Sequence, residues 1–160
     1  MEHGLNKYVL EGDNSMYATE SGLVVPVVTR GGGEVGDTGQ SAGATRISGV
    51  SIQHTPATKL WFGKVSNEAG YRSVPHHHGE AETGGYVLSG RARIYFGDRF
   101  EDYVDLAEDD WVFVPPFMPH VECNVDRNKP LTWMTTRTPE NIVVNLPDVP
   151  DAELPNWLDR

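Results

Sequence analysis

Short, mostly apolar runs of six or seven residues recur along the chain from residue 59 to residue 146. Turn-forming glycine, proline, asparagine and aspartate residues separate them, and no segment of useful length shows the apolar period of a helix. RARIYFG (91–97) leads into a turn at Gly97 and Asp98, and EDYVDL (101–106) returns, which predicts a hairpin. Strands are predicted at 59–65, 85–90, 91–97, 101–106, 110–116, 120–125, 131–137 and 141–146.

The spacing of these runs favours an all-β fold. Strands that recur at intervals of roughly ten residues, separated by turn signals, are typical of a sandwich or a barrel. There is no internal repeat, so a single barrel is expected. Residues 29–45 are rich in Gly, Ser and Thr and are predicted to form a loop, preceded by a short edge strand at 22–28. The expected organisation is an irregular N-terminal arm (1–50), a barrel (51–146) and a short tail (147–160).

Composition and charge exclude several partners. The chain has 160 residues, which suits one domain, and a formal charge of −10 without a basic cluster. Neither nucleic acid nor an anionic membrane is an expected partner, because both require clustered Lys and Arg. The single cysteine, Cys123, excludes an intrachain disulfide, and residues 1–15 lack the apolar core of a signal peptide. With no apolar stretch of transmembrane length, a cytoplasmic protein is expected.

The chemistry suggested by the sequence is concentrated in PHHHGEAETGGYVLSG (75–90). On a strand, alternate side chains share a face, so His76 and His78 point the same way and His77 points the other way. His120 follows a proline-rich turn and begins a predicted strand, which makes it the candidate third imidazole. Glu82 is the candidate carboxylate. Three imidazoles and one carboxylate suit one divalent ion of Fe, Mn, Co, Ni or Zn.

Two ordered motifs resemble those of the cupins. The first motif is matched at Gly70, His76, His78 and Gly90. The second is matched at Pro115, His120 and Asn124, while Asp109 and Phe117 replace its two glycines. The segments HHHGEAET, YVLSGRARIYFGD, FVPPFMPH and ENIVVNL further resemble a bacterial subgroup labelled predicted mannose-6-phosphate isomerases.

The resemblance implies a double-stranded β-barrel, or jelly roll, with a metal inside one end and His76, His78 and His120 as ligands. It also implies a homodimer. The carboxylate is open, because the family position falls on Thr83 rather than on Glu82. A bulge at Gly84–Gly85 would turn Glu82 inwards, and we prefer Glu82 for that reason. Without the bulge, the site would be a three-histidine centre with Thr83 nearby.

Three functions fit such a centre. The preferred one is a metal-dependent, dioxygenase-like oxidoreductase acting on a small oxygenated organic molecule. Its dry pocket would be lined by the aromatic side chains of Trp61, Phe113 and Phe117. Another possibility is a non-catalytic protein that binds a small molecule, because the fold alone does not determine function.

The remaining alternative is an isomerase or lyase acting on a sugar or sugar phosphate. The metal would hold adjacent oxygens of the substrate, and a nearby Glu80 or Tyr86 is the candidate catalytic group that moves the proton. A phosphate would require a cationic partner. The local choices are Arg72, Arg91 and Arg93.

Overall fold

The computed structural model describes residues 26–37 and 42–147, which form strands and turns and contain no helix. This part of the chain therefore contains no helix that could cross a membrane. The strands are β1 (Val35–Asp37), β2 (Ala44–Val50), β3 (Trp61–Asn67), β4 (His76–His77), β5 (Glu82–Ser89), β6 (Ala92–Phe96), β7 (Asp102–Leu106), β8 (Trp111–Val114), β9 (Val121–Asn124), β10 (Leu131–Thr138) and β11 (Val144–Asn145).

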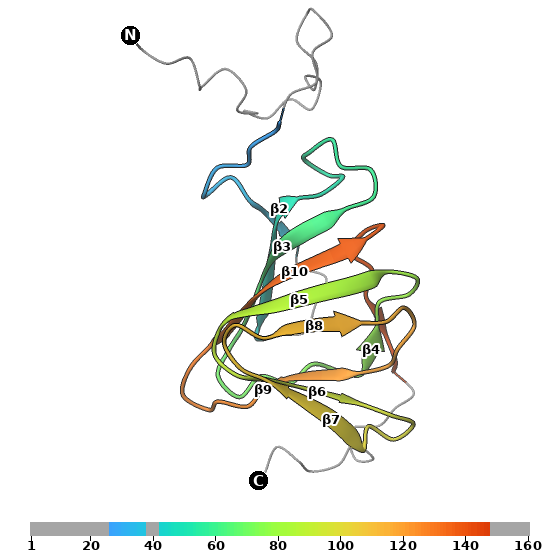
Figure 1. The fold of residues 1–160 in the computed structure, drawn as a ribbon. Coiled ribbons are helices and arrows are strands. Elements are labelled where there is room, and N and C mark those ends of the chain that lie inside the picture. The colour runs from blue at the N-terminus through green and yellow to red at the C-terminus, as the bar shows by residue number, and fades with distance from the viewer. Residues whose placement is uncertain (1–25, 38–41, 148–160) are drawn as a thin grey trace, which may run out of the picture.

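Antiparallel pairing arranges the strands in two layers (Figure 1). One layer is a six-stranded sheet in the order β1-β2-β3-β10-β5-β8, and the other contains the sheet β7-β6-β9. The short pair β11-β4 joins the second layer, because the backbone N–H groups of His76 and His120 donate to each other's carbonyl oxygens at 3.1 and 2.9 Å. The all-β barrel of jelly-roll type that the sequence predicts is confirmed.

Side chains that point inwards from both layers form the main core. In β3, Trp61 and Val65 are buried while Phe62 and Lys64 between them are exposed, as strand alternation requires. The cluster consists of Trp61, Val65, Val87, Ala92, Ile94, Leu106, Val114, Leu131 and Trp133. Burying a large apolar side chain contributes about 1.5–3 kcal/mol, so this cluster holds the two layers together.

The N-terminal part of the barrel differs from the prediction. Strands β3 and β5 to β11 overlap the predicted runs, but β1 lies within the predicted loop 29–45 and β2 begins at its end. Because β2 pairs with β3 along its length, the barrel begins before residue 50, where the sequence placed its edge. Of the run 22–28, only residues 26–28 are described, and residue 28 forms a single bridge. Residues 1–25 and 148–160 of the predicted arm and tail lie outside the described residues.

Candidate metal centre

Three histidines meet between the layers at one end of the barrel. His76 lies in β4, His78 follows that strand, and His120 immediately precedes β9. Their ring centroids are 4.3 to 5.1 Å apart, and each residue is at most 2% exposed. With Glu122 they form a group in which each residue offers one donor atom, all within 4.8 Å of one another. The three histidines that the sequence singled out are therefore adjacent in space.

In each of the three rings, the outer nitrogen atom, Nδ1, lies 2.9 Å from a backbone carbonyl oxygen. The Nδ1 atoms of His76, His78 and His120 lie beside the carbonyl oxygens of residues 74, 142 and 118, respectively. A carbonyl oxygen only accepts, so each Nδ1 carries the proton and each Nε2 presents its lone pair to the interior. Metal-binding histidines are commonly fixed in this way.

The electrostatics of the group also suit a cation. The Nε2 atoms of His76 and His120 are buried and have no hydrogen-bond partner among the described residues. Burial, aided by the nearby His120, lowers the pKa of His76 to about 4. Burial together with the charge of Arg137 lowers the pKa of His78 to about 2. Both rings are neutral at pH 7, which is the form that binds a metal.

Glu122 supplies the carboxylate. It follows His120 by two positions, and its Oε1 lies 3.8 Å from the Nε2 of His120. Burial opposes ionisation of Glu122, but the His120 imidazole and the surrounding positive charge hold its pKa well below the usual value. Three imidazole nitrogens and one carboxylate fit a single divalent transition-metal ion.

Glu82 is not brought to this group. Its side chain at the start of β5 is exposed, while the neighbouring Thr83 points inwards and is 5% exposed. The pairing of β5 with β10 is regular through Gly84–Gly85, and its register shift lies further along, before Ser89. Because the expected bulge is absent there, ordinary strand alternation turns Glu82 outwards.

The two candidate proton-transfer residues also lie elsewhere. Glu80 is exposed in the turn that precedes β5. Tyr86 is on the outer face of β5, where its hydroxyl donates to Asp109 and its ring packs 4.4 Å from that of Trp111. Strand alternation again gives the reason, because the flanking residues Gly85 and Val87 are the ones that point inwards.

The prediction for His77 agrees with its position. Its ring is on the opposite side from the group and accepts a hydrogen bond from the backbone N–H of Gly79 at 2.9 Å. The ring of Phe117 is 6.0 Å away. His77 therefore lies outside the candidate site, although it is adjacent in sequence to His76 and His78.

The aromatic lining expected for the pocket is not formed. Trp61 is buried in the core, but Phe113 and Phe117 are 60% and 63% exposed. Phe117 and Asp109, which stand where the cupin motif has glycine, both have positive φ angles, 57° and 72°. That backbone region favours glycine. The two positions therefore keep the backbone conformation typical of glycine, although neither residue is glycine.

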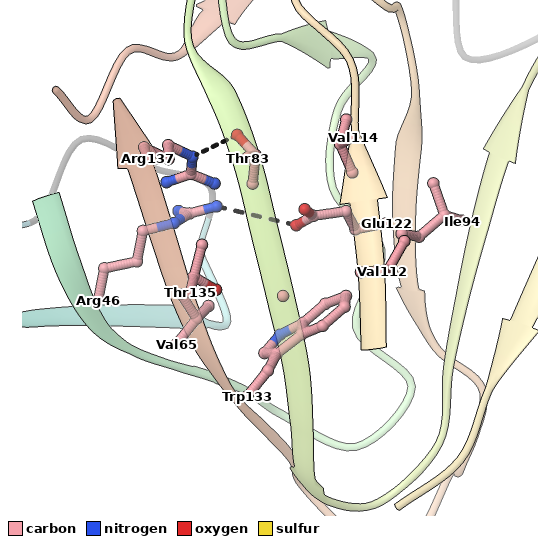
Figure 2. Close-up of a pocket in the computed structure, with 11 residues that line it drawn as sticks. Arg46, Val65, Thr83, Ile94, Val112, Val114, Glu122, Trp133, Thr135 and Arg137 are labelled. Atoms are coloured by element: carbon pink, nitrogen blue, oxygen red, sulfur yellow. Dashed lines mark hydrogen bonds and ion pairs between the residues drawn. The ribbon is translucent and has the colours of Figure 1, made fainter. Parts of the chain in front are cut away.

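A pocket lies beside the four-residue group, between the two layers (Figure 2). Part of the space within it is open to solvent. Glu122 belongs both to the pocket wall and to the four-residue group. The pocket is lined by Arg46, Val65, Thr83, Gly85, Ile94, Val112, Val114, Glu122, Trp133, Thr135 and Arg137.

Two buried arginines supply the positive charge of this pocket. Arg46 from β2 and Arg137 from β10 are 2% and 1% exposed. In Figure 2 their guanidinium groups lie together, with Glu122 reaching towards them from β9. The Nη2 of Arg46 is 3.9 Å from Glu122, and the Nη2 of Arg137 is 3.2 Å from the Nε2 of His78.

Glu122, Arg46 and Arg137 are not predicted as site residues from the sequence. Strand alternation could have found Glu122, because residues two apart on a strand share a face and His120 was already assigned to the interior. The same argument applies to Arg137, which shares the inward face of β10 with Leu131 and Trp133. Arg46 carried no such signal, because its strand was not predicted.

Comparison with solved structures identifies the fold. An RmlC-like cupin from Shewanella frigidimarina is 18% identical over 70% of this chain and 89% of its own, with a TM-score of 0.55. The polyketide cyclase RemF from Streptomyces resistomycificus is 18% identical over 66% of this chain and 72% of its own, with a TM-score of 0.56. An oxalate oxidase is 19% identical over 71% of this chain and 60% of its own, also with a TM-score of 0.56.

Sequence comparison adds no closer relative. No protein-family model matches the chain, and no curated protein is significantly similar to it. At the identities given above, similarity describes the fold and not the reaction. The mannose-6-phosphate isomerase subgroup is not confirmed. The chain has the fold of the cupin, or double-stranded β-helix, proteins.

Proposed function

We propose that the protein is a metal-dependent oxidoreductase of dioxygenase type that acts on a small oxygenated organic molecule. The observation that carries this proposal is the buried group of His76, His78, His120 and Glu122, in which the backbone holds all three Nδ1 atoms. The buried Nε2 atoms of His76 and His120, which have no hydrogen-bond partner within residues 26–37 and 42–147, support a cation as the occupant of this group. The adjoining pocket supports a role beyond metal storage.

The chain's own residues have clear tasks in this proposal. The three histidines and Glu122 hold the ion, which when bound supplies Lewis-acid and, for iron or manganese, redox chemistry. The carbonyl oxygens at the three Nδ1 atoms keep the rings in the tautomer that binds metal. The apolar walls of the pocket restrict water, and the pocket arginines orient the ligand.

The placement of acid–base groups favours an oxidoreductase over an isomerase. An isomerase requires a protein group that moves a proton near the substrate. Glu80 is exposed, and Tyr86 lies on the outer face of β5. Glu122 is the only buried carboxylate among the described residues, and it belongs to the metal group.

Metal content tests the site. The parent protein, the double variant His76→Ala/His120→Ala and the single variant His77→Ala would be purified without a histidine tag or chelator and examined by elemental mass spectrometry. We expect near-stoichiometric metal in the parent and in His77→Ala, and none in the double variant. If all three folded proteins lack metal and take up none of the five candidate ions, the metalloenzyme proposal is wrong.

Oxygen consumption then tests the reaction class. The metal-loaded parent would be placed in an oxygen electrode with hydroxy acids, oxo acids and diols, and His77→Ala would serve as the matched control. Oxygen uptake that depends on substrate and metal supports the oxidoreductase. A loaded protein that converts sugars or sugar phosphates without oxygen uptake would favour the isomerase or lyase. Tight binding without turnover would favour a binding protein.

A further inference from the structure

We infer that Arg137 competes with the metal for the Nε2 atom of His78, so that this histidine completes the centre only when the guanidinium withdraws. This inference concerns the loading of the proposed metal centre and so rests on the proposed function. It starts from a difference among the three imidazoles. The Nε2 atoms of His76 and His120 have no hydrogen-bond partner in the described part of the chain, whereas that of His78 lies 3.2 Å from the Nη2 of Arg137.

The contact between Arg137 and His78 is a hydrogen bond to the lone pair that a metal needs. The Nδ1 of His78 lies 2.9 Å from the carbonyl oxygen of Ile142, which only accepts, so the ring proton is on Nδ1 and the lone pair is on Nε2. A guanidinium has donors only and stays protonated, so its Nη2–H points at that lone pair. The metal binds the same lone pair, and the two occupants therefore exclude each other.

Further contacts keep Arg137 in place when it leaves His78. Its Nε donates to the Thr83 hydroxyl at 3.3 Å, a bond drawn in Figure 2, and its Nη1 donates to the side-chain oxygen of Asn141. The guanidinium also lies over the ring of Trp61, 5.6 Å from the ring centre. Loss of the His78 contact therefore releases one arm of the guanidinium and leaves the others held.

The two nitrogens of His78 are held in different ways by one short segment, residues 137–142. The contact at Nδ1 is made by the backbone of Ile142, and the contact at Nε2 is made by the end of the long side chain of Arg137. A side-chain end can turn away while the backbone stays in place. The guanidinium can therefore be exchanged for a metal while the Ile142 carbonyl oxygen still fixes the ring and its tautomer.

Both charge and hydrogen bonding make this exchange costly. Arg137 is 1% exposed, so little water screens its charge from an ion on the Nε2 of His78. The exchange also removes the acceptor of a buried Nη2–H, which is expensive in a dry interior. His78 should therefore be the weakest of the four metal ligands, and His76, His120 and Glu122 should hold the ion first.

Metal affinity tests the competition. The metal-free parent, Arg137→Met and Arg93→Met would compete with a chromophoric chelator for Zn²⁺ and for Co²⁺. We expect Arg137→Met to bind both ions about tenfold more tightly than the parent, because the competing donor is gone. Arg93→Met removes an arginine from the three-stranded sheet and should keep the parent's affinity. Unchanged or weaker binding by folded Arg137→Met would overturn the inference, and Arg137→Gln takes its place if the Met variant does not fold.

Nitrogen-15 NMR of the imidazole rings tests the contact in the metal-free parent itself. An unprotonated ring nitrogen that accepts a hydrogen bond resonates upfield of one that does not. We expect the Nε2 signal of His78 to lie upfield of that of His76, and Arg137→Met or Arg137→Gln to move it downfield. A His78 signal that is the same in the parent and in the folded variant would contradict the inference.

A double-mutant cycle separates competition at His78 from general charge repulsion. His78→Gln should weaken metal binding less than His76→Gln does, because His78 is the ligand that Arg137 already occupies. In the His78→Gln background, Arg137→Met should give a smaller gain in affinity than it gives in the parent. An equal gain in both backgrounds, or a greater loss from His78→Gln than from His76→Gln, would contradict the inference.

The same titrations distinguish this inference from the proposed function. If neither the parent nor folded Arg137→Met binds any of the five candidate ions, the metal centre and the inference are both wrong. A parent that binds an ion, beside a folded Arg137→Met of equal affinity, contradicts the inference alone. An ion that binds to Arg137→Met but not to the parent supports the competition.

Discussion

The protein pairs an arginine with a carboxylate in two very different surroundings. Inside the barrel, Arg46 and Glu122 are 3.9 Å apart, with side chains only 1% and 10% exposed. On the three-stranded sheet, Arg93 and Asp105 make two hydrogen bonds, one of them at 2.8 Å, but their side chains are 25% and 45% exposed. The shorter contact is therefore the more exposed one.

The difference shows why distance alone is a poor guide to the importance of a charge. Water around Arg93 and Asp105 solvates either partner when the other is removed, so an exposed pair contributes little. Around Glu122 there is little water to replace a missing charge, so loss of one partner leaves the other unbalanced. The interior pair is therefore expected to affect stability and ligand binding. The exposed pair on the sheet is expected to contribute little to either.

The largest expected effect follows from Glu122→Gln in metal-free protein. This change removes the carboxylate charge that faces the buried guanidinium of Arg46 and should lower the free energy of unfolding by about 3–5 kcal/mol. Asp105→Asn makes the same chemical change at the exposed pair and should cost less than about 1 kcal/mol. Urea denaturation followed by circular dichroism, with a chelator present, measures both values. Similar losses in the free energy of unfolding of the two variants would show that burial does not distinguish the two pairs.

A smaller effect is expected from pH, because burial keeps His76 neutral. Its folded-state pKa is about 4, whereas an unfolded histidine titrates near 6.5. Between these values the unfolded chain takes up a proton that the folded protein refuses, so stability is lost as the pH falls from 6.5 to 4. The loss attributable to His76 is about 3 kcal/mol.

Denaturation of the metal-free protein at pH 7 and pH 4 measures this loss. His76→Gln should show a weaker dependence on pH than the parent, because the titrating group is gone. His77→Gln, on the opposite side of the same segment, should keep the parent's dependence. If both variants retain the full dependence, His76 is not the group responsible.

The smallest expected effect is the coupling between Arg93 and Asp105. A double-mutant cycle with Arg93→Met and Asp105→Asn should give about 0.2–1 kcal/mol at low salt, and less in 1 M NaCl because salt screens exposed charges. The same cycle with Arg46→Met and Glu122→Gln should give a larger value that changes little with salt. A coupling at the exposed pair that matches the buried one would remove the distinction.

Much of the barrel could be predicted from sequence because its strands follow a simple rule. Where a strand has apolar residues on its buried face, as β3 has Trp61 and Val65, the pattern is visible in the sequence. In β2, the buried side chains are those of Arg46 and Ser48. No apolar pattern marks this strand, and its neighbourhood is rich in glycine, so it was read as a loop.

The carboxylate was misplaced because register is set by partner strands. A single sequence does not show where one strand shifts against the next, so the glycine pair Gly84–Gly85 does not by itself establish a bulge. A Cβ added at Gly85 would lie 2.9 Å from Cγ1 of Val112 on the paired strand β8. This glycine is therefore explained by a close approach. Local alternation from His120 was the better guide to Glu122.

The order of the site residues along the chain has a consequence for how such a protein diversifies. All four members of the metal group fall within residues 76–122, while the two pocket arginines are encoded on either side of that stretch. They meet because β3 alone separates their strands in the sheet. A lineage can therefore exchange the residues at positions 46 and 137, and with them two of the side chains that line the pocket, while the coding region for the candidate metal-binding residues is inherited unchanged.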